Sequence, residues 1–223
     1  MTTTRRRWHI SALAAAALIV AACGGGDTDA PLASRVIVFG DSVSDVGTYT
    51  PATQIPLGQA AGVPPFFGGK FTTNSHTGYT ATSNTNNANI WVEWVAARLG
   101  VAITPAEVGF VTTRVPCPAA ASVGANTCTG YAQGGARVTD PNGIGKTGGA
   151  LTIPLVEQIA SHNTRVVPGF RTGFGDGDIV FVLGGNNDVF VQFGAVAQGL
   201  PPADAVAAVQ TAATELATLV KTE

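Results

Sequence analysis

Charged side chains are scarce in this chain. They make up 12% of its 223 residues, and 12 basic against 14 acidic side chains leave a net charge of −2 at pH 7. Binding to the phosphate backbone of a nucleic acid requires clustered basic residues. The sequence contains no basic stripe, so it predicts no nucleic-acid partner.

Candidate metal ligands are also few. The chain has 3 cysteines and 3 histidines, and no cysteine has further zinc ligands nearby in the sequence. We therefore expect neither a metal nor a cofactor.

Hydrophobic residues and glycines are abundant. Hydrophobic side chains account for 45% of the chain, which is enough to fill a core. The 28 glycines, together with many Asn, Thr and Ser residues, indicate long polar loops rather than a bundle of helices. The length predicts one domain.

The first residues have the composition of an export signal. Arg5–Arg7 are basic, and the apolar run Ile10–Ala22 that follows is shorter than the ~20 residues that span a bilayer. Residues 20–23, VAAC, resemble a bacterial lipobox, in which the cysteine is acylated. An ordinary signal peptide is the alternative.

The lipobox resemblance implies an exported, membrane-anchored lipoprotein. Residues 1–22 would be the signal peptide, Cys23 the site of lipid attachment and residues 23–33 a flexible tether. Gly24 stands where an inner-membrane retention aspartate would be expected. This favours the outer membrane or the cell surface as the location, with membrane contact through the lipid.

The two remaining cysteines, Cys117 and Cys128, are predicted to pair. Export brings a protein into an oxidising compartment, where two nearby cysteines can form a disulfide. Two free thiols would be unusual there.

Two short apolar runs, 35–39 and 178–183, predict strands that are buried on both faces, as in a parallel sheet. A weaker strand is predicted at 108–112. Helices are predicted over 90–99 with Asn89 as the cap, over 151–162 with Pro154 in the first turn, and over 203–221.

Strands that alternate with helices predict an α/β fold with a parallel sheet and helices on its faces. A loop is expected over 48–89, and loops of this length usually have a function. No strand follows the helix at 203–221, which would leave one edge of the sheet uncovered. We therefore expect the fold to be incomplete at its C-terminus.

Three polar segments are candidates for a site. Ser42 directly follows the first predicted strand, at the sheet edge where open α/β folds bind ligands. Gly134 and Gly135 would let the backbone approach a ligand closely. Asn187 follows the strand at 178–183 and carries a neutral amide donor. Taken singly, each segment is also consistent with an ordinary turn.

Taken in order, the three segments resemble the GDSL, or SGNH, serine hydrolases. Residues 39–47 read FGDSVSDVG, with Val43 in place of the leucine that gives the family its name. Residues 130–136 read GYAQGGA, with Gly130 in place of asparagine, and residues 185–188 read GNND. The segments at 69–72 and 90–94 are also similar to the family.

This resemblance implies a three-layer αβα, flavodoxin-like SGNH hydrolase fold over residues 34–223. It also implies an esterase or lipase that hydrolyses small-molecule or lipid carboxylic esters. Ser42 corresponds to the nucleophile. The oxyanion hole corresponds to the backbone N–H groups of Ser42 and Gly135 and the side-chain amide of Asn187. A thioesterase, phospholipase or carbohydrate deacetylase remains open.

The family's catalytic base, a histidine in an Asp-x-x-His motif, has no counterpart in this chain. His9 lies in the signal segment, His76 in the long loop and His162 at a helix end. None matches the motif, and we expect all three at the solvated surface. The chain is therefore expected to be inactive or nearly so. The alternative function is a non-catalytic surface lipoprotein that binds an acyl or glycan ligand in the same cleft.

Overall fold

The computed structural model describes residues 31–50, 69–73 and 88–222. The predicted signal segment with His9, the lipid-attachment residue Cys23 and the loop residue His76 lie outside these residues. The described residues belong to one compact unit. Within them, no helix is long and apolar enough to cross a membrane.

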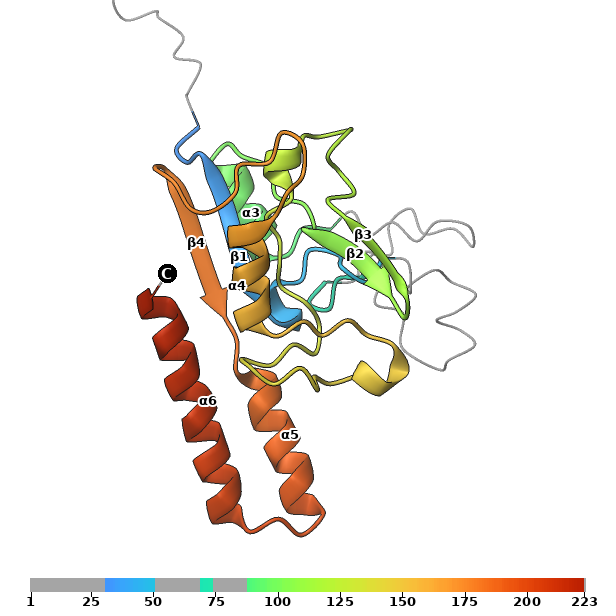
Figure 1. Cartoon of the computed structure of the whole chain (residues 1–223), viewed down its shortest axis with the longest axis vertical. Coiled ribbons are helices and arrows are strands. Elements are labelled where there is room, and N and C mark those ends of the chain that lie inside the picture. The colour runs from blue at the N-terminus through green and yellow to red at the C-terminus, as the bar shows by residue number, and fades with distance from the viewer. Residues whose placement is uncertain (1–30, 51–68, 74–87, 223) are drawn as a thin grey trace, which may run out of the picture. The chain divides into compact units, whose positions relative to one another are not determined.

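Two strands far apart in the sequence pair in parallel (Figure 1). Strand β1 (Arg35–Gly40) runs beside β4 (Asp178–Leu183), with Arg35 opposite Asp178 and Gly40 opposite Leu183. Both strands were predicted, and the structure confirms them and their parallel pairing. The predicted burial on both faces holds for β1 but is wrong for β4, where Val180 is 40% and Leu183 39% exposed. The fold is therefore a mixed α/β arrangement with a short parallel sheet.

Strand β1 lies in the interior of this arrangement. On the side away from β4 it is bonded to residues 129–131: the Val38 N–H donates to the Thr129 carbonyl (3.0 Å), and the Tyr131 N–H donates to the Val38 carbonyl (2.8 Å). All six residues of β1 are buried. Residues 36–39 are all apolar because the strand has neighbours on both edges and both faces.

Alternate side chains of β1 contribute to two separate apolar clusters. Val36 and Val38 pack with helix α3 (Trp91–Arg98), and Ile37 and Phe39 pack against helix α4 (Leu155–Thr164). Successive side chains of a strand point to opposite faces. The two helices therefore cover opposite faces of β1.

The weaker predicted strand at 108–112 forms part of a hairpin instead of the parallel sheet. Strand β2 (Glu107–Phe110) pairs antiparallel with β3 (Thr113–Pro116). The prediction ran two residues too far, because Val111 has a φ of +55° and begins the turn between the strands.

The helix at 90–99 is confirmed, but its predicted cap is wrong. Ile90 occupies the N-cap position, and its N–H donates to the Glu93 carboxylate (2.8 Å), so Asn89 is not the cap. The buried face of the helix carries Val92 and Ala96, and Trp94 is 59% exposed although it is a large apolar residue. The Glu93 carboxylate also forms an ion pair with Lys70 (2.7 Å).

Two further helices and three short helical turns complete the described fold. Helix α4 begins after Pro154, which takes the N-cap position, and the predicted C-terminal helix is α6. Helix α5 was not predicted, because its first residues, Asn186 and Asn187, suggested a turn. The remaining elements are α5 (Asn186–Ala197), α6 (Pro202–Thr222), and the short turns η1 (Ser42–Ser44), η3 (Ala125–Thr127) and η4 (Lys146–Gly148).

Cys117 and Cys128 form a disulfide, with their Cα atoms 5.3 Å apart. Both residues are buried with Ala125 in a small apolar cluster. A bridge that closes a loop of this length contributes about 3 kcal/mol to the free energy of unfolding.

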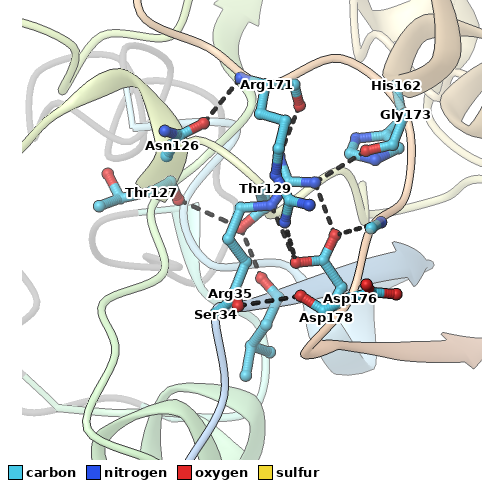
Figure 2. A network of polar contacts seen from close by, with 12 residues as sticks. Ser34, Arg35, Asn126, Thr127, Thr129, His162, Arg171, Gly173, Asp176 and Asp178 are labelled. Carbon is cyan, nitrogen blue, oxygen red and sulfur yellow. Dashed lines mark hydrogen bonds and ion pairs between the residues drawn. The ribbon is translucent and has the colours of Figure 1, made fainter. Parts of the chain in front are cut away.

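A buried ion pair joins the first residues of β1 and β4, Arg35 and Asp178 (Figure 2). Arg35 donates to the carboxylate of Asp178 (2.7 Å) and to the backbone carbonyls of Arg171 (2.6 Å) and Gly173 (2.7 Å). The Asp178 carboxylate also bonds to the guanidinium of Arg171. Every side-chain charge in this cluster therefore has a partner.

His162 lies beside this cluster, fully buried, so the expectation of a solvated surface position is wrong for it. Its ring contacts those of Phe39, Tyr131, Phe170 and Phe174. Its Nδ1 lies 3.1 Å from the Tyr131 hydroxyl. Burial, and then the charge of Arg35, lower the pKa of His162 to about 4.

Candidate functional site

Three loops meet at the carboxyl ends of β1 and β4. The first loop (residues 41–45) follows β1, the second loop (133–136) follows the segment paired with β1, and the third loop (184–188) follows β4. Each pair of loops is joined by a side-chain hydrogen bond. These bonds run from Asn186 Nδ2 to Asp41 Oδ2 (3.0 Å), from the Gly134 N–H to Asp45 Oδ2 (2.8 Å), and from Asn187 Nδ2 to the Ala136 carbonyl (2.7 Å).

Ser42, the predicted nucleophile, is half-buried at the start of η1. Asp41 caps this turn by accepting a hydrogen bond from the Val43 N–H (3.0 Å). Within the described part of the chain, neither the hydroxyl nor the backbone N–H of Ser42 has a hydrogen-bond partner. Burial raises the pKa of Asp41.

Gly135, a predicted oxyanion donor, lies in the second loop in a conformation that favours glycine. Its φ is +80°, and a Cβ at this position would lie 2.0 Å from the Ile144 carbonyl oxygen. No residue among those described accepts a hydrogen bond from the Gly135 N–H. An unpaired main-chain donor is uncommon away from bulk solvent. The sequence thus identified a glycine that is needed here, and its N–H is free of internal partners.

Asn187, the third predicted oxyanion donor, is 5% exposed in the first turn of α5. Its amide donates one hydrogen bond, to the Ala136 carbonyl. An amide nitrogen carries two hydrogens, so one donor remains. The neighbouring Asn186 is exposed, and its amide is bonded to Asp41. The structure therefore brings the loops of all three predicted residues together.

Besides Asp41, two further buried carboxylates hold these loops, and neither was predicted to have a role. Asp45 accepts hydrogen bonds from the N–H groups of Gly47 (2.9 Å), Thr48 (2.7 Å) and Gly134 (2.8 Å). Burial raises its pKa to about 6. The sequence offered one signal for this role, namely that Asp45 lies inside the FGDSVSDVG segment.

The second carboxylate, Asp188, lies in the third loop and is also buried. It accepts hydrogen bonds from Arg137 Nε (3.0 Å) and from the Val138 N–H (3.1 Å). The start of α5 is thereby fastened to the residues that follow the second loop. The sequence shows that Asp188 follows Asn187, but it does not predict the hydrogen bonds to Arg137 and Val138.

A cavity of about 320 Å³ opens between α4 and the β2–β3 hairpin and reaches Gln133 of the second loop. Neither Ser42, Gly135 nor Asn187 lines it. Its polar lining includes Glu107, Arg114, Gln133, Glu157 and Ser161.

No histidine in the described part of the chain belongs to the three loops. His162 is enclosed by aromatic rings beside Arg35, and its neighbours lie outside these loops. The described residues also contain no group of three or more His, Cys, Asp or Glu side chains that could hold a metal ion.

Neither a family model, nor a curated protein, nor a solved structure matches this chain. What the three loops do is therefore inferred from their geometry and from the motif resemblance.

Proposed function

We propose that this chain is a serine ester hydrolase of the GDSL, or SGNH, type that acts on carboxylic esters. One observation supports this most strongly. Three hydrogen-bonded loops meet at one sheet edge, and the main-chain N–H groups of Ser42 and Gly135 have no acceptor among the described residues. Ligands bind at this edge in open α/β folds.

In the proposed reaction, the Ser42 hydroxyl oxygen attacks the ester carbonyl carbon. Negative charge then develops on the carbonyl oxygen. The N–H groups of Ser42 and Gly135 and the second amide hydrogen of Asn187 would donate to this oxygen. Donors that are fixed in place before the reaction stabilise such charge without reorganisation, and each contributes about 3–4 kcal/mol to the lowering of the barrier.

The proton of the serine hydroxyl requires a base. Among the described histidines there is only His162, which is buried with Nδ1 near the Tyr131 hydroxyl and has a pKa lowered to about 4. It does not fill this role. The residues described here therefore support slow hydrolysis at most.

The finer fold assignment, a three-layer flavodoxin-like SGNH hydrolase, is part of this proposal. The parallel pairing of β1 and β4 supports it, as do α3 and α4 on opposite faces of β1. We also propose export and lipid anchoring through Cys23, with a lipid or small-molecule ester as the substrate. The Cys117–Cys128 disulfide is consistent with an oxidising compartment.

A non-catalytic lipoprotein that binds an acyl or glycan ligand at the same loops is the second candidate. One observation favours it: the described residues place no histidine beside Ser42. The two functions differ in their dependence on the Ser42 hydroxyl, because a binder needs the cleft but not the nucleophile.

Hydrolysis of a p-nitrophenyl acyl ester by purified protein tests the proposal. We expect a slow release of nitrophenolate that Ser42→Ala abolishes. Ser161→Ala, which removes a hydroxyl from α4 away from the three loops, should retain the wild-type rate. Equal rates for the wild type and Ser42→Ala would contradict the esterase proposal and leave ligand binding as the better explanation.

A further inference from the structure

The peptide unit between Gly134 and Gly135 carries both the Gly134 carbonyl and the Gly135 N–H. A peptide unit is planar, and in the trans form its C=O and N–H point in opposite directions. No cis peptide bond is present among the described residues. The group that holds the Gly134 carbonyl oxygen therefore also determines where the Gly135 N–H points.

The hydroxyl of Tyr49 holds this carbonyl. It donates a hydrogen bond to the Gly134 oxygen over 2.9 Å, and it accepts one from the Thr152 N–H over 3.0 Å. A backbone N–H can only donate, and a carbonyl oxygen can only accept. The hydroxyl proton of Tyr49 must therefore point at Gly134.

The ring of Tyr49 is fixed by its surroundings. It is 5% exposed and meets the ring of Phe71 edge-on, with the ring centres 6.0 Å apart. A Cβ at Gly134 would lie 2.3 Å from Phe71 Cζ and 3.1 Å from Tyr49 Cε2. Glycine at this position is what allows both rings to pack against the loop.

Three of the four main-chain polar groups of this glycine pair have internal partners. The Gly134 N–H donates to Asp45, the Gly134 carbonyl accepts from Tyr49, and the Gly135 carbonyl accepts from the Ile144 N–H (2.9 Å). The fourth group, the Gly135 N–H, has no hydrogen-bond partner among the described residues. The pair is thus held on all sides except at the group expected to donate to an oxyanion.

Thr152 completes the support from the other side. Its φ is +45°, which a β-branched residue rarely adopts, and its methyl group would lie 2.9 Å from a Cβ at Gly135. Such backbone conformations persist where the surrounding structure fixes them. In this conformation the Thr152 N–H points at the Tyr49 hydroxyl and donates a hydrogen bond to it.

We propose that Tyr49 is a positioning residue whose hydroxyl orients the Gly134–Gly135 peptide and so aims the Gly135 N–H at the substrate oxygen. This inference rests on the proposed function. A hydrogen bond to the carbonyl also polarises the peptide and makes its N–H a stronger donor. Tyr49 touches no substrate atom; it acts through Gly135.

The test compares Tyr49→Phe with Tyr131→Phe. Each variant removes the hydroxyl of a buried tyrosine and keeps the ring, but the Tyr131 hydroxyl faces His162 and not the second loop. Burial raises the pKa of both tyrosines, so both hydroxyls are protonated at neutral pH. Amide NMR spectra of the full chain and ester hydrolysis are measured for the wild type and both variants.

We expect Tyr49→Phe to shift the Gly135 amide proton upfield and Tyr131→Phe to leave it in place. In hydrolysis, Tyr49→Phe should lower kcat about tenfold at an unchanged KM, a part of the hundredfold or larger loss that follows removal of a whole oxyanion donor. A role limited to stability would lower the fraction of folded protein without moving the Gly135 resonance of the folded form.

The possible results separate this inference from the esterase proposal. An unmoved Gly135 resonance in folded Tyr49→Phe overturns the inference, whether or not hydrolysis is measurable. The inference also fails if the two Phe variants have equal kcat values while Ser42→Ala is inactive. If Ser42→Ala hydrolyses as fast as the wild type and the Gly135 resonance still moves in Tyr49→Phe, the esterase proposal fails and the positioning of the peptide stands.

Discussion

The two ends of the β1–β4 pair differ in how their polar groups are satisfied. At the amino end, Arg35, Arg171 and Asp178 pair with one another or with backbone carbonyls (Figure 2). At the carboxyl end, the N–H groups of Ser42 and Gly135 have no acceptor within the described residues. A saturated network locks strands together, whereas donors without an internal partner are available to a ligand. We therefore expect changes at the amino end to affect mainly stability, and changes to the free donors at the carboxyl end to affect mainly the proposed function.

Removing a charge from the amino end should have the largest effect on stability. The side chains of Arg35 and Asp178 are 4% and 2% exposed, so Arg35→Met would leave a buried carboxylate with fewer partners. We expect a loss of about 3–5 kcal/mol in the free energy of unfolding, measured by urea denaturation.

The matched control is Arg114→Met, which breaks the pair with Glu107. The Arg114 side chain is 54% exposed, and exposed pairs contribute less than about 1 kcal/mol. If both variants lost the same free energy of unfolding, the network at the amino end would not be the main source of stability.

Removing a donor from the carboxyl end should affect catalysis instead. We expect Asn187→Ala to lower kcat at least about a hundredfold, with a small change in KM, because the proposed donor to the charged carbonyl oxygen is lost. The variant also loses the bond to the Ala136 carbonyl. The measurement is steady-state hydrolysis of a p-nitrophenyl ester. An unchanged kcat would remove Asn187 from the mechanism.

Asn186→Ala serves as the neighbouring comparison. It loses the bond to Asp41 but no proposed oxyanion donor. We therefore expect its kcat to fall by about threefold at most. If kcat fell further in Asn186→Ala than in Asn187→Ala, Asn186 and not Asn187 would be the oxyanion donor.

Acid should weaken the amino end through His162. Its folded pKa, about 4, is below the value of 6.5 for an unperturbed histidine, so the unfolded chain binds the proton first. Stability from this residue is complete above pH 6.5 and is lost as the pH falls towards 4. The loss amounts to about 3 kcal/mol.

Urea denaturation between pH 7 and pH 4 measures this effect, with His162→Phe as the comparison. The variant keeps an aromatic ring but cannot titrate, so its stability should fall less over this range. Parallel pH profiles for the two proteins would contradict the pKa assigned to His162.

The two strands were predictable as strands because each is a run of consecutive apolar residues, although only β1 is buried along its whole length. The runs at 35–39 and 178–183 have no alternation, and both became strands of the parallel pair. The first and third loops were expected at the ends of predicted strands, and the motif resemblance added the second loop to them. Local pattern was sufficient for the strands, and the motif resemblance was needed for the site.

Features that depend on distant partners were not predictable. His162 ends a helix and was expected in solvent, but the rings that bury it come from residues 39, 131, 170 and 174. The β2–β3 hairpin required the turn at Val111, a residue with no turn preference. The role inferred for Tyr49 arises from its contacts with Gly134 and Thr152, which lie more than 80 residues away in the sequence.

An amide NMR spectrum of the protein after reaction with a fluorophosphonate tests the unpaired donors most directly. The reagent places a tetrahedral phosphoryl group, with oxygen where an oxyanion would develop, on a reactive serine hydroxyl. We predict a single adduct on Ser42 and downfield shifts of the amide protons of Ser42 and Gly135. An adduct on Ser42 that leaves the Gly135 amide proton unmoved, or a protein that forms no adduct on Ser42, would contradict the assignment of this edge as an ester-hydrolysing site.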